Sequence, residues 1–124
     1  MKKEKDCIFC KIIAKEIPAK FLLETKDLVV IQNARPSAPV HHLVIPKEHI
    51  KSVAHLGKKD AKIIGEMFLA ARDDAEKAKL AGYKTVFNVG RDGGQIIDHL
   101  HLHLLGGWKK QQDIDKMPNP DLDK

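Results

Sequence analysis

Residues 98–105 read Asp98-His99-Leu100-His101-Leu102-His103-Leu104-Leu105, a strict alternation of imidazole and leucine side chains. Successive side chains of a β-strand point to opposite faces, so the alternation predicts a strand with histidines on one face and leucines on the other. The leucine face packs on the core, because a register slip of one residue would bury the imidazoles instead. Neighbouring imidazoles on this face stand about 6.6 Å apart. They are therefore spaced to contact different atoms of one anionic group, or one metal ion and one substrate.

Three interpretations of this histidine face are open. The imidazoles lie on a solvated strand without a function, they bind a metal ion together with distant ligands, or they act on an anion. The chain has 124 residues and seven histidines, so three of them on one face without a role is the least favoured interpretation. We carry forward the hypothesis of anion chemistry at one or more of His99, His101 and His103.

The rest of the sequence predicts an α+β domain, in which a five-stranded antiparallel sheet is combined with one long and one short helix. The long helix is expected over residues 60–80, with Asp60 as its N-cap and Gly82 as its left-handed terminator. The short amphipathic helix is expected over residues 7–16, ahead of a proline. The strands are expected at residues 19–24, 28–33, 42–46, 85–89 and 96–105.

Two adjacent histidines, His41 and His42, stand at the entry to the strand expected over residues 42–46. Adjacent residues of a strand point to opposite faces. One of the two is therefore expected to join the histidine face, while the other faces outward or packs in an interface.

A pair of cysteines near the start of the chain, Cys7 and Cys10, has the i and i+3 spacing of zinc ligands on one helix face. A redox Cys-x-x-Cys motif is the alternative, but that motif needs a preceding strand and a βαβ context that a position at the chain start does not offer. Zinc needs two further ligands, and His49 and His99 are the best candidates. The sequence therefore favours a structural zinc site over two unligated cysteines.

A glycine-rich turn, residues 88–95, joins the last two expected strands. Gly93 and Gly94 permit positive φ and a close approach of backbone N–H groups to a phosphate. Ordinary hairpin turns use the same residues, so the turn gains weight only because it lies beside the histidines. The Gly-x-Gly-x-x-Gly and P-loop patterns are absent, so a helix-start loop is not expected to hold the phosphate.

Composition bounds the remaining possibilities. The chain fits one domain over residues 1–124, with residues 1–6 and 109–124 as flexible or irregular tails. A formal charge of +5 favours anionic small molecules, whereas a basic stripe with interleaved aromatics, typical of nucleic-acid binding, is missing. The sequence has no apolar run of about 18 residues and no signal peptide. We therefore expect no membrane association and a cytoplasmic location with reduced cysteines.

The segment from His99 to Leu105 resembles the His-φ-His-φ-His-φ-φ signature of the histidine triad superfamily. The similarity extends over Cys7–Cys10, Asn33–His49, the turn Asn88–Gln95 and Gly106-Gly107, and it looks closest to the Hint branch of nucleoside phosphoramidate hydrolases. The resemblance implies a homodimer whose two five-stranded sheets join into one. It also implies hydrolysis of purine nucleoside monophosphate conjugates at the α-phosphate, through a covalent nucleotidyl-histidine, without an organic cofactor.

The resemblance also implies a role for individual residues. His101 would be the nucleophile, and His103 and His41 would contact phosphate oxygens or relay protons. The implied zinc ligands are Cys7, Cys10, His49 and His99, with the metal in a structural role. The implied substrate contacts are Asn33 and Ala34 at the ribose and base, and Asn88, Gly94, Gln95 and His103 at the phosphate side.

The chain departs from the pattern at two of these places, because Ile96 stands where relatives often carry a hydroxyl, and Asn33 stands where an acid often binds the ribose. Two enzymatic alternatives share the same nucleophile, namely dinucleoside polyphosphate hydrolysis and nucleotidyl transfer. A non-catalytic purine-nucleotide-binding or interaction protein is the alternative outside enzymology.

Overall fold

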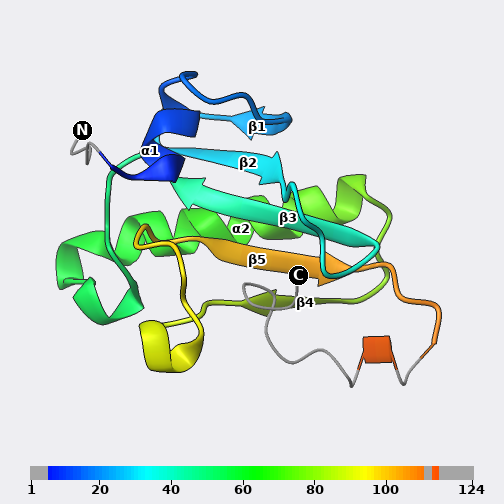
Figure 1. Cartoon of the computed structure of the whole chain (residues 1–124). Helices are drawn as coiled ribbons and strands as arrows, with labels where there is room; N and C mark the ends of the chain where they lie inside the picture. Colours follow the sequence, from blue (N-terminus) through cyan, green and yellow to red (C-terminus); the bar gives the residue numbers. More distant parts are fainter. Residues whose placement is uncertain (1–5, 111–112, 115–124) are drawn as a thin grey trace.

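Five antiparallel strands form one sheet in the order β1-β2-β3-β5-β4 in the computed structural model, which describes residues 6–110 and 113–114 (Figure 1). The central strand β3 pairs with β2 on one side and β5 on the other. The α+β architecture predicted from the sequence is confirmed. The strands are β1 (Phe21–Glu24), β2 (Leu28–Gln32), β3 (Val40–Pro46), β4 (Tyr83–Val86) and β5 (Leu102–Gly106).

The two helices cover opposite faces of the sheet. The long helix α2 (Ala61–Lys77) packs on one face through Met67, Ala70 and Ala71, against a core that includes alternate residues of β2, β3 and the β5 region. The short helix α1 (Ile8–Ile13) packs on the other face through Phe9 and two isoleucines. In Figure 1, α2 runs behind the sheet and α1 lies in front of its upper edge.

Alternation along β3 and β5 divides the side chains between these two faces. Leu100 and Leu102 join the core beneath α2, so the leucines face the long helix as predicted. Leu43 of β3 pairs with His103 of β5 and belongs to the cluster beneath α1. The histidine face is therefore the face that carries α1.

Helix α2 is shorter than residues 60–80 at both ends. Asp60 does not cap α2 with its side chain, because its Oδ2 accepts a hydrogen bond from Gly57 N at 2.8 Å in a 3₁₀ turn just before the helix. Gly82 does not terminate it either, since the left-handed residue is Lys79, with φ of 60°. The early stop lets Leu80 fold back onto β5, where a Cβ added to Gly106 would lie 2.8 Å from its Cδ1.

The last strand begins at Leu102 rather than at residue 96. Val44 pairs with Leu102, which is the last pair of the β3–β5 ladder. Continuing the register places His101 opposite Ile45 and Leu100 opposite Pro46, and proline has no N–H to donate. Leu100 N donates instead to Ile50 O at 2.6 Å, and residues 99–101 lie outside the strand.

Other boundaries shift by a few residues. The short helix covers residues 8–13 rather than 7–16, and Ile8 is exposed rather than buried. The fourth strand covers residues 83–86 rather than 85–89. The predicted tails lie mostly outside the described residues, although Ile114 O accepts a hydrogen bond from Lys84 Nζ. Within the described part of the chain, no helix is long and apolar enough to cross a bilayer.

Candidate active site and metal cluster

Four of the predicted site histidines are buried on one side of the sheet. His103 lies in β5, His99 and His101 lie in the segment just before it, and His41 lies in β3, each with at most 4% of its surface exposed. The His101 and His103 ring centroids are 4.9 Å apart, and those of His41 and His103 are 5.1 Å apart. The alternation of residues 99–103 thus places the rings together, as predicted.

His41 has a defined tautomer, because Ser37 N donates to His41 Nδ1 at 2.9 Å. A neutral His41 then carries its proton on Nε2, which lies 2.9 Å from His103 Nδ1. The two rings are therefore within hydrogen-bond distance of each other and offer a short path for a proton. The amide nitrogen of Asn33, which is itself a donor, lies 3.2 Å from the same His41 nitrogen, so the predicted substrate contact Asn33 lies beside this pair.

His101 has the opposite tautomer. Its Nδ1 donates to the carbonyl oxygen of His99 at 2.7 Å, so the neutral ring carries its lone pair on Nε2. Phe9 of α1 meets the ring edge-on, with centroids 5.0 Å apart. The imidazole is therefore held in one orientation with its lone pair on a defined nitrogen, the form in which an imidazole can act as a nucleophile.

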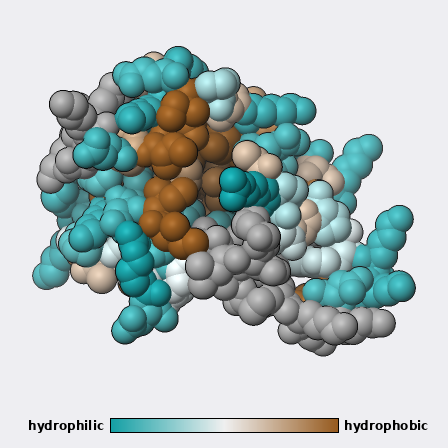
Figure 2. Space-filling model, viewed as in Figure 1, coloured by the Kyte–Doolittle hydropathy of each residue, from teal (hydrophilic) through white to brown (hydrophobic). Residues whose placement is uncertain are grey.

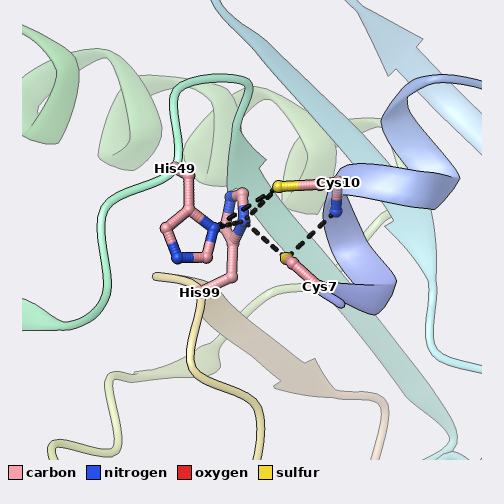
Figure 3. A group of neighbouring side chains, drawn as sticks. All are labelled: Cys7, Cys10, His49 and His99. Carbon is pink, nitrogen blue, oxygen red and sulfur yellow. Dashed lines mark hydrogen bonds between the residues drawn. The ribbon is translucent and has the colours of Figure 1, made fainter. Parts of the chain in front are cut away.

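The four predicted zinc ligands converge in one cluster (Figure 3). Cys7 and Cys10 come from the start of α1, His49 from the segment after β3 and His99 from the segment before β5. All four donor atoms lie within 4.8 Å of one another. His99 Nδ1 lies 3.2 Å from Cys7 Sγ and 3.1 Å from His49 Nδ1, and His49 Nδ1 lies 3.4 Å from Cys10 Sγ.

The donor set fits a tetrahedral zinc ion. Zinc–sulfur and zinc–nitrogen bonds of about 2.3 and 2.0 Å place tetrahedral ligand atoms about 3.3–3.8 Å apart, close to the distances in the cluster. His99 Nε2 donates to Pro46 O at 2.9 Å, which leaves Nδ1 as the ligating nitrogen. Metal-binding histidines commonly donate their other ring N–H to a carbonyl in this way. Burial lowers the pKa of His99 to about 4, so the ring is in its ligating neutral form at neutral pH.

The glycine-rich turn between β4 and β5 is held by its own side chains. Gly90 and Gly94 have φ of 71° and 89°, whereas Gly93 does not need a positive φ. The buried Gln95 accepts a hydrogen bond from Gly90 N and donates to Lys51 O. Gln95 thus fixes the turn with the amide that was predicted to contact substrate, while Asn88 is half-buried at the start of the same turn.

A cavity of about 770 Å³ extends from His101 toward Asn33 and Ala34. Its apolar wall was not predicted from the sequence, and it comes from Phe9, Ile12, Ile31, Leu43, Ile96 and Ile97. Figure 2 shows an apolar strip on this face, along the region of α1. The i and i+3 spacing of Phe9 and Ile12 on the short helix is the feature of the sequence that could have predicted this wall. Both residues pack on the sheet face that carries the histidines.

A second cavity of about 560 Å³ shares Ile8, Ile96 and Ile97 with the first. Its polar lining includes Lys51 and Asp98. Arg91 pairs with both oxygens of Asp98, at 2.8 and 3.0 Å, and so braces the glycine-rich turn. Ile96, the position that departs from the family pattern, therefore separates two hollows instead of offering a hydroxyl to one of them.

Comparisons with known proteins find relatives over most of the chain. The family model described as "Scavenger mRNA decapping enzyme C-term binding" matches residues 6–117. Protein HitA from Neisseria gonorrhoeae is 43% identical over 102 residues, which are 82% of this chain and 95% of HitA.

Two solved structures extend this likeness to the fold. A HIT family hydrolase from Clostridium thermocellum is 40% identical, with a TM-score of 0.84 over 86% of this chain and 95% of that one. A hypothetical histidine triad nucleotide-binding protein from Sulfolobus tokodaii is 31% identical, with a TM-score of 0.75 over 93% of this chain and 78% of that one. The fold is thus shared with both.

Proposed function

The chain belongs to the histidine triad (HIT) superfamily, and we propose that it hydrolyses purine nucleoside monophosphate conjugates at the α-phosphate, with His101 as nucleophile. The observation that carries the proposal is the hydrogen bond from His101 Nδ1 to His99 O, which leaves the lone pair on Nε2. Imidazole suits this step because it is nucleophilic when neutral and leaves readily from phosphorus.

The reaction proceeds in two displacements. His101 Nε2 attacks the α-phosphorus, the new N–P bond forms, and the bond from phosphorus to the leaving amine breaks. The amine takes a proton from the His41–His103 pair. Water then attacks the same phosphorus, returns a proton to that pair, breaks the N–P bond and releases the monophosphate. The 2.9 Å contact between His41 and His103 supports the relay.

The substrate lies in the cavity that ends at His101. The purine packs against Phe9 and the isoleucines of the apolar wall, and the ribose lies at Asn33 and Ala34. The turn that holds Asn88 and Gly94 contacts the phosphate side through its backbone. The apolar wall contributes mainly by removing the base from water.

Cys7, Cys10, His49 and His99 would hold zinc in a structural role. With four protein donors in the cluster, no position would remain for a reactive water. Bound zinc supplies a cross-link between α1 and the segments that flank β3 and β5. Chelation therefore lowers the melting temperature and inactivates the enzyme slowly, whereas a catalytic metal would predict immediate loss.

The active form is a homodimer that joins two sheets through β4. This strand is an edge strand with β5 as its neighbour, and unpaired edges are template sites for pairing. Tyr83 on β4 and Phe68 and Leu69 on α2 are exposed, so apolar side chains lie next to the unpaired edge. Light scattering at micromolar concentration should give twice the chain mass, and Tyr83→Lys should shift it toward the monomer.

The test is hydrolysis of adenosine 5′-phosphoramidate by the wild type, by His101→Ala, and by His55→Ala as a matched control. His55 is exposed in a 3₁₀ turn away from the cavity, so its variant should keep full turnover. His101→Ala should lose turnover by about 10³-fold or more, in line with removal of a catalytic nucleophile, yet still bind the nucleotide and the same amount of zinc.

Each contrary result points to one alternative. Turnover of dinucleoside polyphosphates instead of the phosphoramidate would assign the same nucleophile to that reaction. Nucleotide binding without any turnover in the wild type would favour the non-catalytic alternative. Full activity in His101→Ala would refute the proposal.

A further inference from the structure

The cavity that ends at His101 has a one-sided charge. Its lining includes two cations, Lys20 and Arg35, and no carboxylate. Both side chains are exposed at the rim, and within the described residues neither belongs to a resolved salt bridge. The cavity as a whole therefore favours an anionic ligand beyond the attraction exerted by the histidines.

Lys20 stands far from His101 across the sheet. Its carbonyl accepts a hydrogen bond from Gln32 N at the end of β2. Gln32 pairs with His42 on β3, and continuing the register places the backbone of His101 three ladder positions away and one strand further across. Gln32 and His101 are thus offset by about 10 Å along the strands and about 9.6 Å across them, and Lys20 lies on the far side of Gln32. A phosphate at His101 and an anion at Lys20 are therefore separate groups.

Arg35 is held at this rim by the residue placed at the ribose edge. Asn33 Oδ1 accepts a hydrogen bond from Arg35 N at 2.9 Å, which turns the chain so that Asn33 and Arg35 line the same hollow. A carboxylate at residue 33 would bind a ribose diol and repel an anion there. A neutral amide beside a guanidinium has the opposite preference. In dinucleotide-binding sites, likewise, an acid binds the ribose hydroxyl of NAD, whereas an arginine accommodates the ribose phosphate of NADP.

We propose that this rim is a second anion subsite and that the preferred substrates are nucleoside 5′-phosphate conjugates carrying a further phosphate on the ribose. Arg35 and Lys20 contact that phosphate while His101 contacts the α-phosphate. The assignment rests on the proposed function, since that function puts the ribose at Asn33. Arginine and lysine both bind phosphate well, and arginine does so through paired hydrogen bonds.

The test measures the affinity of four nucleotides for the full chain by calorimetry, and their inhibition constants against phosphoramidate hydrolysis. Adenosine 3′,5′-bisphosphate or adenosine 2′,5′-bisphosphate should bind about tenfold more tightly than adenosine 5′-monophosphate at 20 mM salt, and the comparison of the two isomers identifies the hydroxyl. The advantage should fall to about twofold at 0.5 M salt, because the rim is exposed and its charges are screened. Adenosine 5′-diphosphate controls for added charge at the other end of the ligand.

Variants assign the effect to residues. Arg35→Ala and Lys20→Ala should each remove most of the bisphosphate advantage and leave the affinity for the monophosphate unchanged within about twofold, since the screened rim charges act on the second phosphate. The matched control is Lys26→Ala, which removes the same charge from an exposed lysine in the turn between β1 and β2. Lys26→Ala should keep the full advantage.

The outcomes distinguish a failure of the second anion subsite from a failure of the proposed hydrolase function. Equal affinity for bisphosphates and the monophosphate, with hydrolysis intact, would overturn the second subsite alone. An advantage that Arg35→Ala and Lys20→Ala leave unchanged would overturn the assignment to these residues. Failure of every nucleotide to bind would overturn the proposed function, and the second subsite with it.

Discussion

The adjacent histidines of β3 serve opposite faces of the sheet, and this division gives a sharp prediction. His41 contacts His103 on the histidine face, whereas His42 Nδ1 contacts Asp74 Oδ2 of α2 at 2.5 Å. Both partners of this second contact keep only 11% of their side-chain surface exposed. His42 and Asp74 therefore attach the long helix to the strand that carries His41. Removing either side chain leaves the other buried without its hydrogen-bond partner.

The perturbation is a double-mutant cycle with His42→Phe and Asp74→Leu. Each single change leaves one buried polar group without its partner, which costs about 2 kcal/mol of unfolding free energy. The double variant replaces both by apolar groups, so it should lie within about 1 kcal/mol of the wild type. The two changes are thus coupled by about 3 kcal/mol.

Urea unfolding followed by circular dichroism measures this coupling. With a slope of about 1.5 kcal/mol per molar urea for a chain of this size, each single variant should unfold about 1.3 M earlier than the wild type. Phosphoramidate hydrolysis should stay within about twofold in all folded variants, because the pair acts on the far face from His101. Additive effects, with a coupling below about 0.5 kcal/mol, would refute the pairing, and a large loss of turnover in the folded double variant would refute the division of faces.

Three further outcomes are expected. Leu102→Ala should lower the unfolding free energy by about 3 kcal/mol, because this side chain is 1% exposed beneath α2, whereas Leu69→Ala on the exposed side of α2 should change the monomer little. Gly94→Ala should cost about 1–2 kcal/mol, since an L side chain is strained at φ of 89°, and it should reduce hydrolysis while the core stays folded. The hydrogen bond from Gly57 N lowers the pKa of Asp60, so its contribution is present above the usual carboxyl pKa and lost as pH falls through the lowered value. The stability difference between the wild type and Asp60→Asn should therefore shrink in acid, and a constant difference in melting temperature across that range would contradict this.

The histidine face could be predicted because a period of two is a strong constraint. Any strand-like backbone places His99, His101 and His103 together, whether or not the sheet ladder reaches them. The ladder stops at the pair Val44–Leu102, whose two members are more than fifty residues apart in the chain, and only the register between β3 and β5 shows that the two positions meet. Local pattern therefore indicated the face correctly and the length of the strand incorrectly.

The end of α2 shows a second limit of local reasoning. Glycine favours the left-handed conformation, so Gly82 was the natural terminator. In the structure the left-handed residue is Lys79, and the next residue, Leu80, packs over Gly106. The apolar wall around Phe9 escaped prediction for a similar reason, since the contact of α1 with His101 depends on how a short helix docks on the sheet.

His99 belongs to two constellations at once. Its ring nitrogen faces the cysteines, and its carbonyl oxygen accepts the proton-bearing nitrogen of His101. One residue therefore links the cluster of cysteines and histidines to the position of the proton on the His101 ring. The nitrogen NMR signals of His101 become a reporter of events at Cys7 and Cys10, two side chains that do not line the cavity ending at His101.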